Sequence, residues 1–185
     1  MDNNNEMEIA TLANGCFWCT EAIFKKLKGV KSILPGYAGG TVKNPSYNQV
    51  CTGITGHAES IQIKFDPKVI SFEKILDIFW HTHDPTTLNR QGNDVGTQYR
   101  SAIFYHDEKQ KEIAEKSKKD IEQEHVYKDP IVTEISPFKN FYVAEDYHKD
   151  YYENHKDNSY CNLIIDPKLD KLLKKYRNEV KEEYK

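Results

Sequence analysis

The sequence predicts an α/β (α+β) fold in which helices pack against a mixed sheet. Strand-like and helix-like segments alternate along the chain and are joined by short turns, as in a domain that covers a sheet with helices. The chain has 185 residues, a length that suits one domain and allows roughly 70% of the unfolded surface to be buried. No internal repeat or low-complexity linker divides it. We therefore expect a single domain.

The N-terminal part predicts a strand, a turn and a helix. Residues 9–13 are apolar or small, which indicates a short buried strand, and Asn14-Gly15 then forms a turn. A helix is expected over residues 17–28 because Gly29 is a favourable helix end.

The next part of the chain predicts a second strand and a second helix. Polar and apolar residues alternate over residues 59–65, which places three apolar side chains on one strand face: Ile61, Ile63 and Phe65. Ser71 can cap a helix. Its apolar stripe consists of Phe72, Ile75, Leu76, Phe79 and Trp80.

A loop and a further strand and helix follow. Residues 84–96 are rich in Gly, Asn, Asp and Pro, which predicts a loop, and a strand is expected over residues 99–105. Asp107 with Gln110 resembles a capping box that opens a charged helix ending near Glu124.

The C-terminal part predicts one more strand and a last helix. The strand is expected over residues 131–135. Asp166 before Pro167 is typical of a helix start. The inward-facing residues of this helix are Leu169, Leu172, Leu173 and Tyr176.

Composition agrees with a cytoplasmic enzyme. The formal net charge is −3, and charges of both signs are spread along the chain, so neither nucleic acid nor a membrane is an expected partner. The first residues are polar and lack the features of a signal peptide, and no apolar run approaches the length of a membrane span. We expect a cytoplasmic location, and nothing in the sequence requires more than a monomer.

Cysteine usage indicates redox or metal chemistry. Four cysteines, Cys16, Cys19, Cys51 and Cys161, are too few for a disulfide scaffold. In a reducing compartment such cysteines serve redox reactions or bind metal.

Cys16 lies where the predicted turn meets the predicted helix. Free N–H groups and the positive end of the helix dipole favour a thiolate there. A cysteine of ordinary pKa, about 8.5, is only a few per cent thiolate at neutral pH, so a lowered pKa prepares it for attack. We therefore expect a reactive Cys16 with a lowered pKa, beside an apolar pocket made by Phe17 and Trp18. A buried structural cysteine at a tight turn is the alternative.

Glu59 shares the parity of the apolar residues in its strand. Its carboxylate should therefore point toward the apolar layer. A buried carboxylate without a neighbouring cation has a raised pKa and stays protonated near neutral pH, which a general acid requires. Alternatively, Glu59 begins the strand at the rim of the sheet and is solvated.

Seven motifs occur in an order that resembles one enzyme family. They are Gly15-Cys16-Phe17-Trp18-Cys19-Thr20-Glu21, Gly36-Tyr37-Ala38-Gly39-Gly40, Asn44-Pro45-Ser46-Tyr47, Thr55-Gly56-His57-Ala58-Glu59, His83-Asp84-Pro85, the run over residues 91–101, and Ala144-Glu145-Asp146-Tyr147-His148. Together they resemble the A-type methionine sulfoxide reductases, the peptide-methionine (S)-S-oxide reductases. The likeness extends from about Glu8 to about Lys175, and this many motifs in order are specific.

The resemblance implies a two-layer ferredoxin-like plait. It also implies a single catalytic domain over residues 1–185, with an unstructured polar tail at 1–7 and a C-terminal segment from about 144 to 185 that carries a cysteine and the last helix.

The resemblance assigns roles to individual residues. Glu59 matches the acid that holds and protonates the sulfoxide oxygen, and Tyr47 and Tyr99 match two hydroxyl donors to that oxygen. The substrate methyl group would lie against Phe17 and Trp18. Asp94 matches a supporting acid in the substrate pocket, although it is equally suited to be a turn residue.

The resemblance also implies the reaction, reduction of methionine S-sulfoxide, free or in a protein. Protonation of the oxygen makes the sulfur electrophilic, Cys16 attacks it, methionine leaves, and Cys16 becomes a sulfenic acid. A second thiol condenses with it to form a disulfide, which thioredoxin or a similar dithiol reduces. No metal or organic cofactor is required.

Two thiols are candidates for that second step. Cys161 resembles the distal resolving cysteine of the family, and we favour it. Cys19 forms a Cys-x-x-Cys pair with Cys16, which is chemically able to form a disulfide. Many family members carry Gly at the Cys19 position, so the local route stays open here. Cys51, in a short helical stretch near Tyr47, is expected to be a buried structural thiol.

A thioredoxin-like disulfide oxidoreductase is one alternative function. The spacing of Cys16 and Cys19 permits it. It leaves Glu59, Tyr47 and Tyr99 without a role.

A metal-binding module is the other alternative. It would use His81, His83 and Asp84 together with the cysteines. Histidines at a helix end more often cap carbonyl groups, and no second close pair has the spacing of a zinc site.

Overall fold

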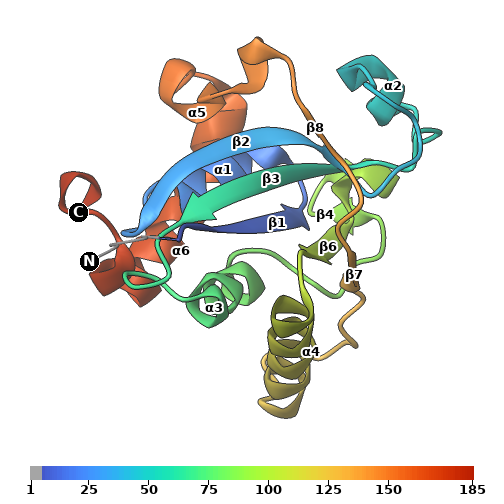
Figure 1. Ribbon diagram of the computed structural model, residues 1–185. Helices are drawn as coiled ribbons and strands as arrows, with labels where there is room; N and C mark the ends of the chain where they lie inside the picture. The colour runs from blue at the N-terminus through green and yellow to red at the C-terminus, as the bar shows by residue number, and fades with distance from the viewer. Residues whose placement is uncertain (1–5) are drawn as a thin grey trace.

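Six strands form the main sheet, in the order β7, β6, β1, β3, β2 and β8 (Figure 1). The computed structural model describes residues 6–185. The strands are β1 (Glu8–Asn14), β2 (Val30–Ala38), β3 (Ala58–Phe65), β6 (Ser101–Tyr105), β7 (Glu134–Pro137) and β8 (Phe141–Val143). Only β6 and β7 are parallel; the other neighbours are antiparallel. The predicted α/β class with a mixed sheet and packed helices is confirmed.

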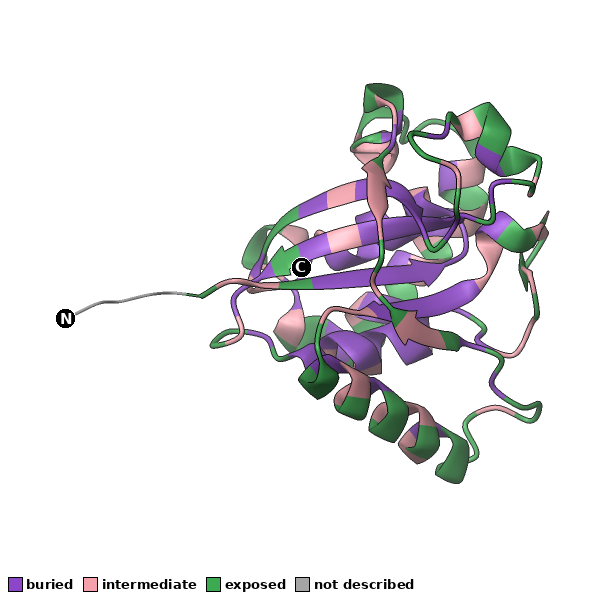
Figure 2. Ribbon diagram, turned by 45° about the vertical axis from the view of Figure 1, so that its right-hand side comes forward, coloured by how far each residue is buried: buried purple, intermediate pink, exposed green. Residues whose placement is uncertain are grey.

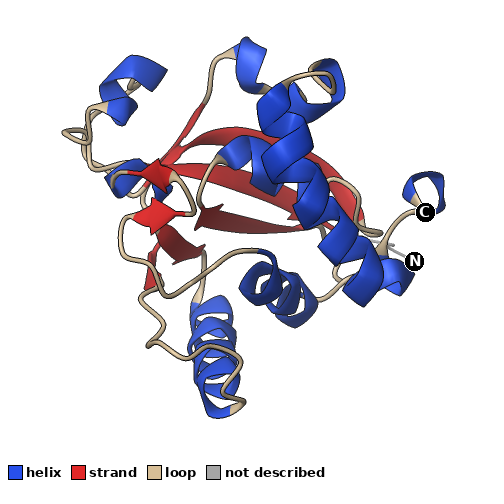
Figure 3. Ribbon diagram, turned by 180° about the vertical axis from the view of Figure 1, so that it is seen from behind, coloured by secondary structure: helices blue, strands red, loops and turns tan. Residues whose placement is uncertain are grey.

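Helices cover one face of the sheet, as Figure 3 shows from behind. They are α1 (Phe17–Phe24), α3 (Phe72–Thr82) and α6 (Asp166–Tyr176), with α4 (Glu108–Gln123) beside α3. Two short helices, α5 (Tyr151–Asn154) and α2 (Tyr47–Cys51), lie apart from each other in the upper part of Figure 1, α5 on the left and α2 on the right. The connections include the two-residue strands β4 (Arg90–Gln91) and β5 (Asp94–Val95), short 3-10 helices at Thr97–Tyr99 and Asp146–His148, and a π-helix at Cys161–Ile165 that leads into α6.

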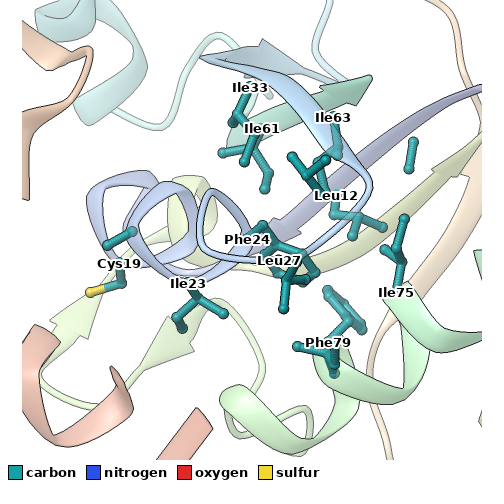
Figure 4. Close-up of a cluster of buried hydrophobic side chains, with 14 of the residues drawn as sticks. Leu12, Cys19, Ile23, Phe24, Leu27, Ile33, Ile61, Ile63, Ile75 and Phe79 are labelled. Atoms are coloured by element: carbon teal, nitrogen blue, oxygen red, sulfur yellow. The ribbon is translucent and has the colours of Figure 1, made fainter. Parts of the chain in front are cut away.

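The alternation of each strand divides the core between the two sheet faces. Leu12, Ile61 and Ile63 pack under the helices with Phe24 and Phe79, in the large cluster of Figure 4. The opposite face carries mostly small residues, Ala13, Ala38, Ala58 and Ala102 with Phe104, and the partly buried Phe138 and Phe141 pack against them. The central strands are therefore buried on both faces, as the purple ribbon in Figure 2 shows.

Several predicted elements shift at their ends. The first helix ends at Phe24 rather than at Lys28, because Lys26 and Leu27 donate to carbonyl groups three residues earlier and tighten the chain into turns. The strand expected over residues 131–135 is found at Glu134–Pro137, because Val132 N–H donates to Pro85 in a neighbouring loop instead of to the sheet.

The other helix starts follow the predicted caps. Ser71 accepts a hydrogen bond from Lys74 N–H, and Asp107 accepts one from Gln110 N–H. The reciprocal bond of the second cap goes one residue further back, since the Gln110 side chain accepts from His106 N–H.

Two further predictions concern membranes and the N-terminal tail. Within residues 6–185, no helix combines the length and apolar character needed to cross a membrane. Residues 1–5 of the predicted polar tail lie outside the described residues.

Candidate active site

Cys16 is the residue that precedes α1, at the end of a tight connection from β1. Gly15 makes that connection with a φ of +98°, and a Cβ atom there would lie 2.6 Å from Cγ of Gln91. Both the left-handed backbone and the close approach require glycine. The Cys16 carbonyl accepts the first helical hydrogen bonds, from Cys19 and Thr20 N–H, so its thiol stands at the helix start as predicted.

The lowered pKa expected for Cys16 is not found. Burial raises the pKa of the Cys16 thiol, and a hydrogen bond with Cys19 and the charge of Glu59 raise it further. Desolvation therefore outweighs the helix dipole, since Cys16 is only 7% exposed. The same hydrogen bond lowers the pKa of Cys19 to about 7. In this state the thiolate of the pair resides mainly on Cys19.

Glu59 lies in β3 and is only 1% exposed. The burial predicted from strand parity is confirmed, and a solvated position at the rim is excluded. Its Oε2 accepts Phe17 N–H at 3.0 Å, which brings the acid next to Cys16. Burial raises the pKa of Glu59 to about 8. The carboxyl group is therefore mostly protonated at neutral pH and can donate a proton.

Tyr47 at the start of α2 and Tyr99 in the 3-10 helix approach the same acid. Burial raises the pKa of both phenols, and the charge of Glu59 is the next contribution in each case. Both hydroxyl groups thus remain protonated donors at physiological pH.

Trp18 forms an aromatic wall with residues from the C-terminal segment. Its indole stacks on Tyr151 with ring centroids 3.6 Å apart, and its Nε1–H donates to Nδ1 of His148 at 3.0 Å. Phe17 is buried and also packs against His148, with ring centroids 4.9 Å apart. Phe17 is buried within this wall, whereas Trp18 is half-buried.

Tyr160 closes the site between Asp94 and the thiols. Its hydroxyl donates to Oδ2 of Asp94 at 2.9 Å and lies 3.7 Å from Sγ of Cys19. Its ring meets Trp18 edge-on at 5.8 Å. Asp94, expected near the substrate, therefore binds Tyr160 in this state.

Glu145 joins three segments behind the site. Its two carboxylate oxygens accept Tyr37 O–H at 2.7 Å and Tyr47 N–H at 2.8 Å. These bonds lower its pKa and keep it charged. Glu145 thereby fixes the start of α2 relative to β2.

The remaining two cysteines differ in burial. Cys161 is buried at the start of the π-helix, and the charge of Cys19 is among the causes that raise its pKa. The π-helix that carries it contacts α1, the helix of Cys19. Cys51 is exposed, so the prediction of a buried structural thiol is wrong. It ends α2, a five-residue helix in which Val50 alone is buried.

The two histidines proposed as metal ligands in the alternative function instead bond to backbone carbonyl groups of α3. His81 and His83 each place Nδ1 on a carbonyl of α3, those of Asp77 and Phe79. His83 also bonds Ser101 through Nε2. In the described part of the chain, no three His, Cys, Asp or Glu side chains are arranged to hold a metal ion.

The structure thus gathers Cys16, Cys19, Glu59, Tyr47, Tyr99, Phe17, Trp18, Asp94 and Cys161 around one site. Sequence analysis missed four contributors: His148, Tyr151, Tyr160 and Glu145. His148 and Glu145 stood in a quoted motif, and Tyr160 adjoined Cys161. Membership of that motif and proximity to Cys161 could have indicated these three residues from the sequence.

A buried acid beside a pair of thiols defines a thiol-dependent oxidoreductase. The family model described as peptide methionine sulfoxide reductase matches residues 8–181, and the chain belongs to that family. It is 58% identical over 175 residues to peptide methionine sulfoxide reductase MsrA from Saccharolobus solfataricus, covering 95% of this chain and 98% of the relative.

Solved structures are similar as well. The reduced form of Mxr1 from Saccharomyces cerevisiae has a TM-score of 0.80 and 37% identity, covering 87% of this chain and 92% of that one. Mxr1 in complex with Trx2 has a TM-score of 0.58 and 29% identity, covering 82% of this chain and 88% of that one.

Proposed function

We propose that the protein reduces methionine S-sulfoxide, free or in an oxidised protein, to methionine. The observation that carries this proposal is the hydrogen bond from Phe17 N–H to Glu59, which holds a buried, largely protonated acid against the residue after Cys16. Sulfoxide reduction needs an acid that protonates the oxygen of the S=O group and a nucleophile that attacks its sulfur.

The first half-reaction uses both groups. The sulfoxide oxygen accepts hydrogen bonds from Glu59, Tyr47 and Tyr99, while the methyl group lies against Phe17 and Trp18. Glu59 transfers its proton to the oxygen as the Cys16 sulfur attacks the substrate sulfur, and the proton of the Cys16 thiol returns to the Glu59 carboxylate. Methionine leaves and the oxygen stays on Cys16 as a sulfenic acid, so the substrate gains the two electrons that Cys16 loses.

The contacts favour Cys19 as the thiol that meets the sulfenic acid first. It is hydrogen-bonded to Cys16, and its pKa of about 7 gives it thiolate at neutral pH. A Cys16–Cys19 disulfide forms and water leaves. Cys161, favoured from the sequence, belongs to the π-helix that contacts α1, the helix of Cys19. In the next step its thiolate attacks Cys19, releases Cys16 as a thiolate and forms a Cys19–Cys161 disulfide.

Thioredoxin is the proposed reductant of this last disulfide. The complex of Mxr1 with Trx2 supports this assignment. A thioredoxin-like activity of the chain itself is not favoured, because it gives no role to Glu59 and the two tyrosines.

We also infer a ferredoxin-like plait, a single catalytic domain and a cytoplasmic monomer. Support for the plait comes from the neighbour order β6, β1, β3 and β2, with α1 and α3 as the crossovers. The match over residues 8–181 supports one domain.

The test is turnover of separated S and R epimers of a methionine sulfoxide peptide with thioredoxin as reductant. We expect reduction of the S epimer alone and its loss in Cys16→Ser. Turnover in that variant would contradict the mechanism, and turnover of neither epimer would contradict the function.

A further inference from the structure

The outer edge of β8 has no partner strand among residues 6–185. Ala144 N–H donates to the Pro35 carbonyl at 2.9 Å, so the backbone groups of Ala144 face β2. Because these groups alternate sides along an antiparallel strand, those of Phe141 and Val143 point away from β2. β8 therefore presents the N–H and C=O groups of two residues on an open edge.

A groove of about 540 Å³ lies along β8. Its walls are residues 44–46 and Gln49 on one side, and Phe141–Val143 with Glu145 on the other. α2 and β8 lie near each other at one end of the sheet in Figure 1. The groove thus separates an open strand edge from the loop that leads into α2.

Two hydrogen bonds hold the walls of the groove. Asn140 Nδ2–H donates to the Gly40 carbonyl at 2.9 Å, and Tyr47 N–H donates to Oε1 of Glu145 at 2.8 Å. The second bond joins the groove to the active site, because Tyr47 also packs against His148, with ring centroids 4.6 Å apart.

The chemistry of the groove suits a neutral main chain. The side chains facing the strand are amides and a hydroxyl, those of Asn44, Ser46 and Gln49. Glu145 is the charged residue among those lining it, and both its carboxylate oxygens already accept hydrogen bonds. Val143 is 58% exposed and offers apolar contact. The main chain of an extended peptide can form hydrogen bonds with the free N–H and C=O groups of this edge, whereas an ion finds no free charge of opposite sign there.

We propose that a peptide containing methionine sulfoxide adds its main chain, in extended form, to the open edge of β8, while the sulfoxide side chain passes Tyr47 to reach Cys16. The proposal rests on the proposed function and deepens it, because it makes unfolded or extended protein segments the preferred substrate. Three residues of β8 span about 10 Å, enough for two or three residues of the peptide.

The decisive variant is Val143→Pro. Proline removes the N–H that faces the groove and leaves the groups that bond β2 intact. Val143→Ala is the matched control, because it keeps the N–H and shortens the exposed side chain. Each is assayed on N-acetyl-methionine sulfoxide methylamide and on a hexapeptide with a central methionine sulfoxide. The decisive ratio is measured with dithiothreitol as reductant, so that docking of thioredoxin does not contribute, and a parallel series with thioredoxin shows whether an effect is confined to that reductant.

In Val143→Pro we expect the ratio of kcat/KM for the hexapeptide to that for the methylamide to fall roughly threefold to tenfold, the loss of one net hydrogen bond. Val143→Ala should keep the ratio within about twofold. An unchanged ratio in Val143→Pro, or a decrease confined to thioredoxin-driven turnover, would overturn the proposal; the second outcome would assign the groove to the reductant.

Hydrogen exchange separates this proposal from the proposed function. In Cys16→Ser, which cannot turn over, a saturating hexapeptide should slow exchange of the Phe141 and Val143 amides. Absence of protection would overturn the strand addition. Protection combined with an inactive wild-type protein would leave the peptide site standing and remove the reductase function.

Discussion

The indole N–H of Trp18 donates to Nδ1 of His148 at 3.0 Å, across a separation of 130 residues. Burial lowers the pKa of His148, so the ring is neutral and carries its proton on Nε2. Within the described residues, that Nε2 has no hydrogen-bond partner, and Oε2 of Glu145 lies 3.8 Å away. His148 thus orients Trp18 through Nδ1, while its own Nε2–H makes no hydrogen bond to the described residues.

His148→Ala should therefore release Trp18. We expect KM for the sulfoxide to rise and kcat/KM to fall about tenfold, since one buried hydrogen bond and a ring contact are lost. His148→Gln keeps a side-chain acceptor and should lose less. Steady-state kinetics on the S epimer measures both. Equal effects of the two variants on kcat, with KM unchanged, would exclude this positioning role.

Glu59 should set the alkaline limb of the rate. With a pKa of about 8 the acid form predominates below pH 8 and is lost above it, so kcat/KM should decline as pH rises through that value. Glu59→Gln should lower the rate by roughly 10²- to 10⁴-fold and remove this limb. A pH profile of Glu73→Gln, an exposed carboxylate on α3, is the control. If Glu59→Gln retains the limb, the acid lies elsewhere.

The order of the thiols can be read from trapped intermediates. Cys161→Ser should release one equivalent of methionine, accumulate a Cys16–Cys19 disulfide and fail to recycle with thioredoxin. Cys19→Ser should instead accumulate sulfenic acid on Cys16. Peptide mapping by mass spectrometry distinguishes them. Rapid recycling in Cys19→Ser would mean that Cys161 reaches Cys16 directly.

Tyr160→Phe should raise the pKa of Cys19. The Tyr160 hydroxyl lies 3.7 Å from the Cys19 sulfur and can turn its proton from Asp94 to that sulfur when Cys19 is a thiolate. This hydrogen bond is one of the interactions that lower the pKa of Cys19 to about 7. Without it, less thiolate is present at neutral pH, and alkylation of Cys19 should slow. The rate of iodoacetamide labelling between pH 6 and 9, followed by peptide mapping, measures the shift. An unchanged labelling profile would argue against the contact.

Glu21 should make stability depend on pH. Burial raises its pKa from 4.5 to about 7, so its contribution is fully present below pH 4.5 and is lost as pH rises to 7. At about 1.4 kcal/mol per pKa unit the loss is roughly 3 kcal/mol. Glu21→Gln can still accept the Asp150 N–H bond and should flatten this dependence. Urea unfolding of both proteins at pH 5 and pH 8 tests this; parallel decreases would refute it.

Local patterns predicted the parts of the site that depend on short stretches of sequence. The strand, turn and helix around Cys16 follow from a glycine and two apolar runs, and the burial of Glu59 follows from parity with Ile61. Both depend on geometry that repeats every few residues.

Long-range contacts escaped prediction for the same reason. The raised pKa of Cys16 results from burial by distant segments, and the roles of His148 and Tyr160 depend on a non-repetitive segment packing back onto α1. The strand β8 has three residues, too short for a pattern to stand out. The prediction that Cys51 is buried was wrong because a short helix buries few of its residues.

The 130-residue separation between Trp18 and His148 also has a consequence for biosynthesis. Translation proceeds from the N-terminus, so Cys16 and Trp18 emerge long before the segment that holds the indole and brings Tyr160 to the thiols. A growing polypeptide therefore carries Cys16, the proposed nucleophile, without the aromatic contacts around Trp18. We expect selective chemistry at Cys16 to begin only when the late segment has docked, which would tie the onset of activity to the completion of folding.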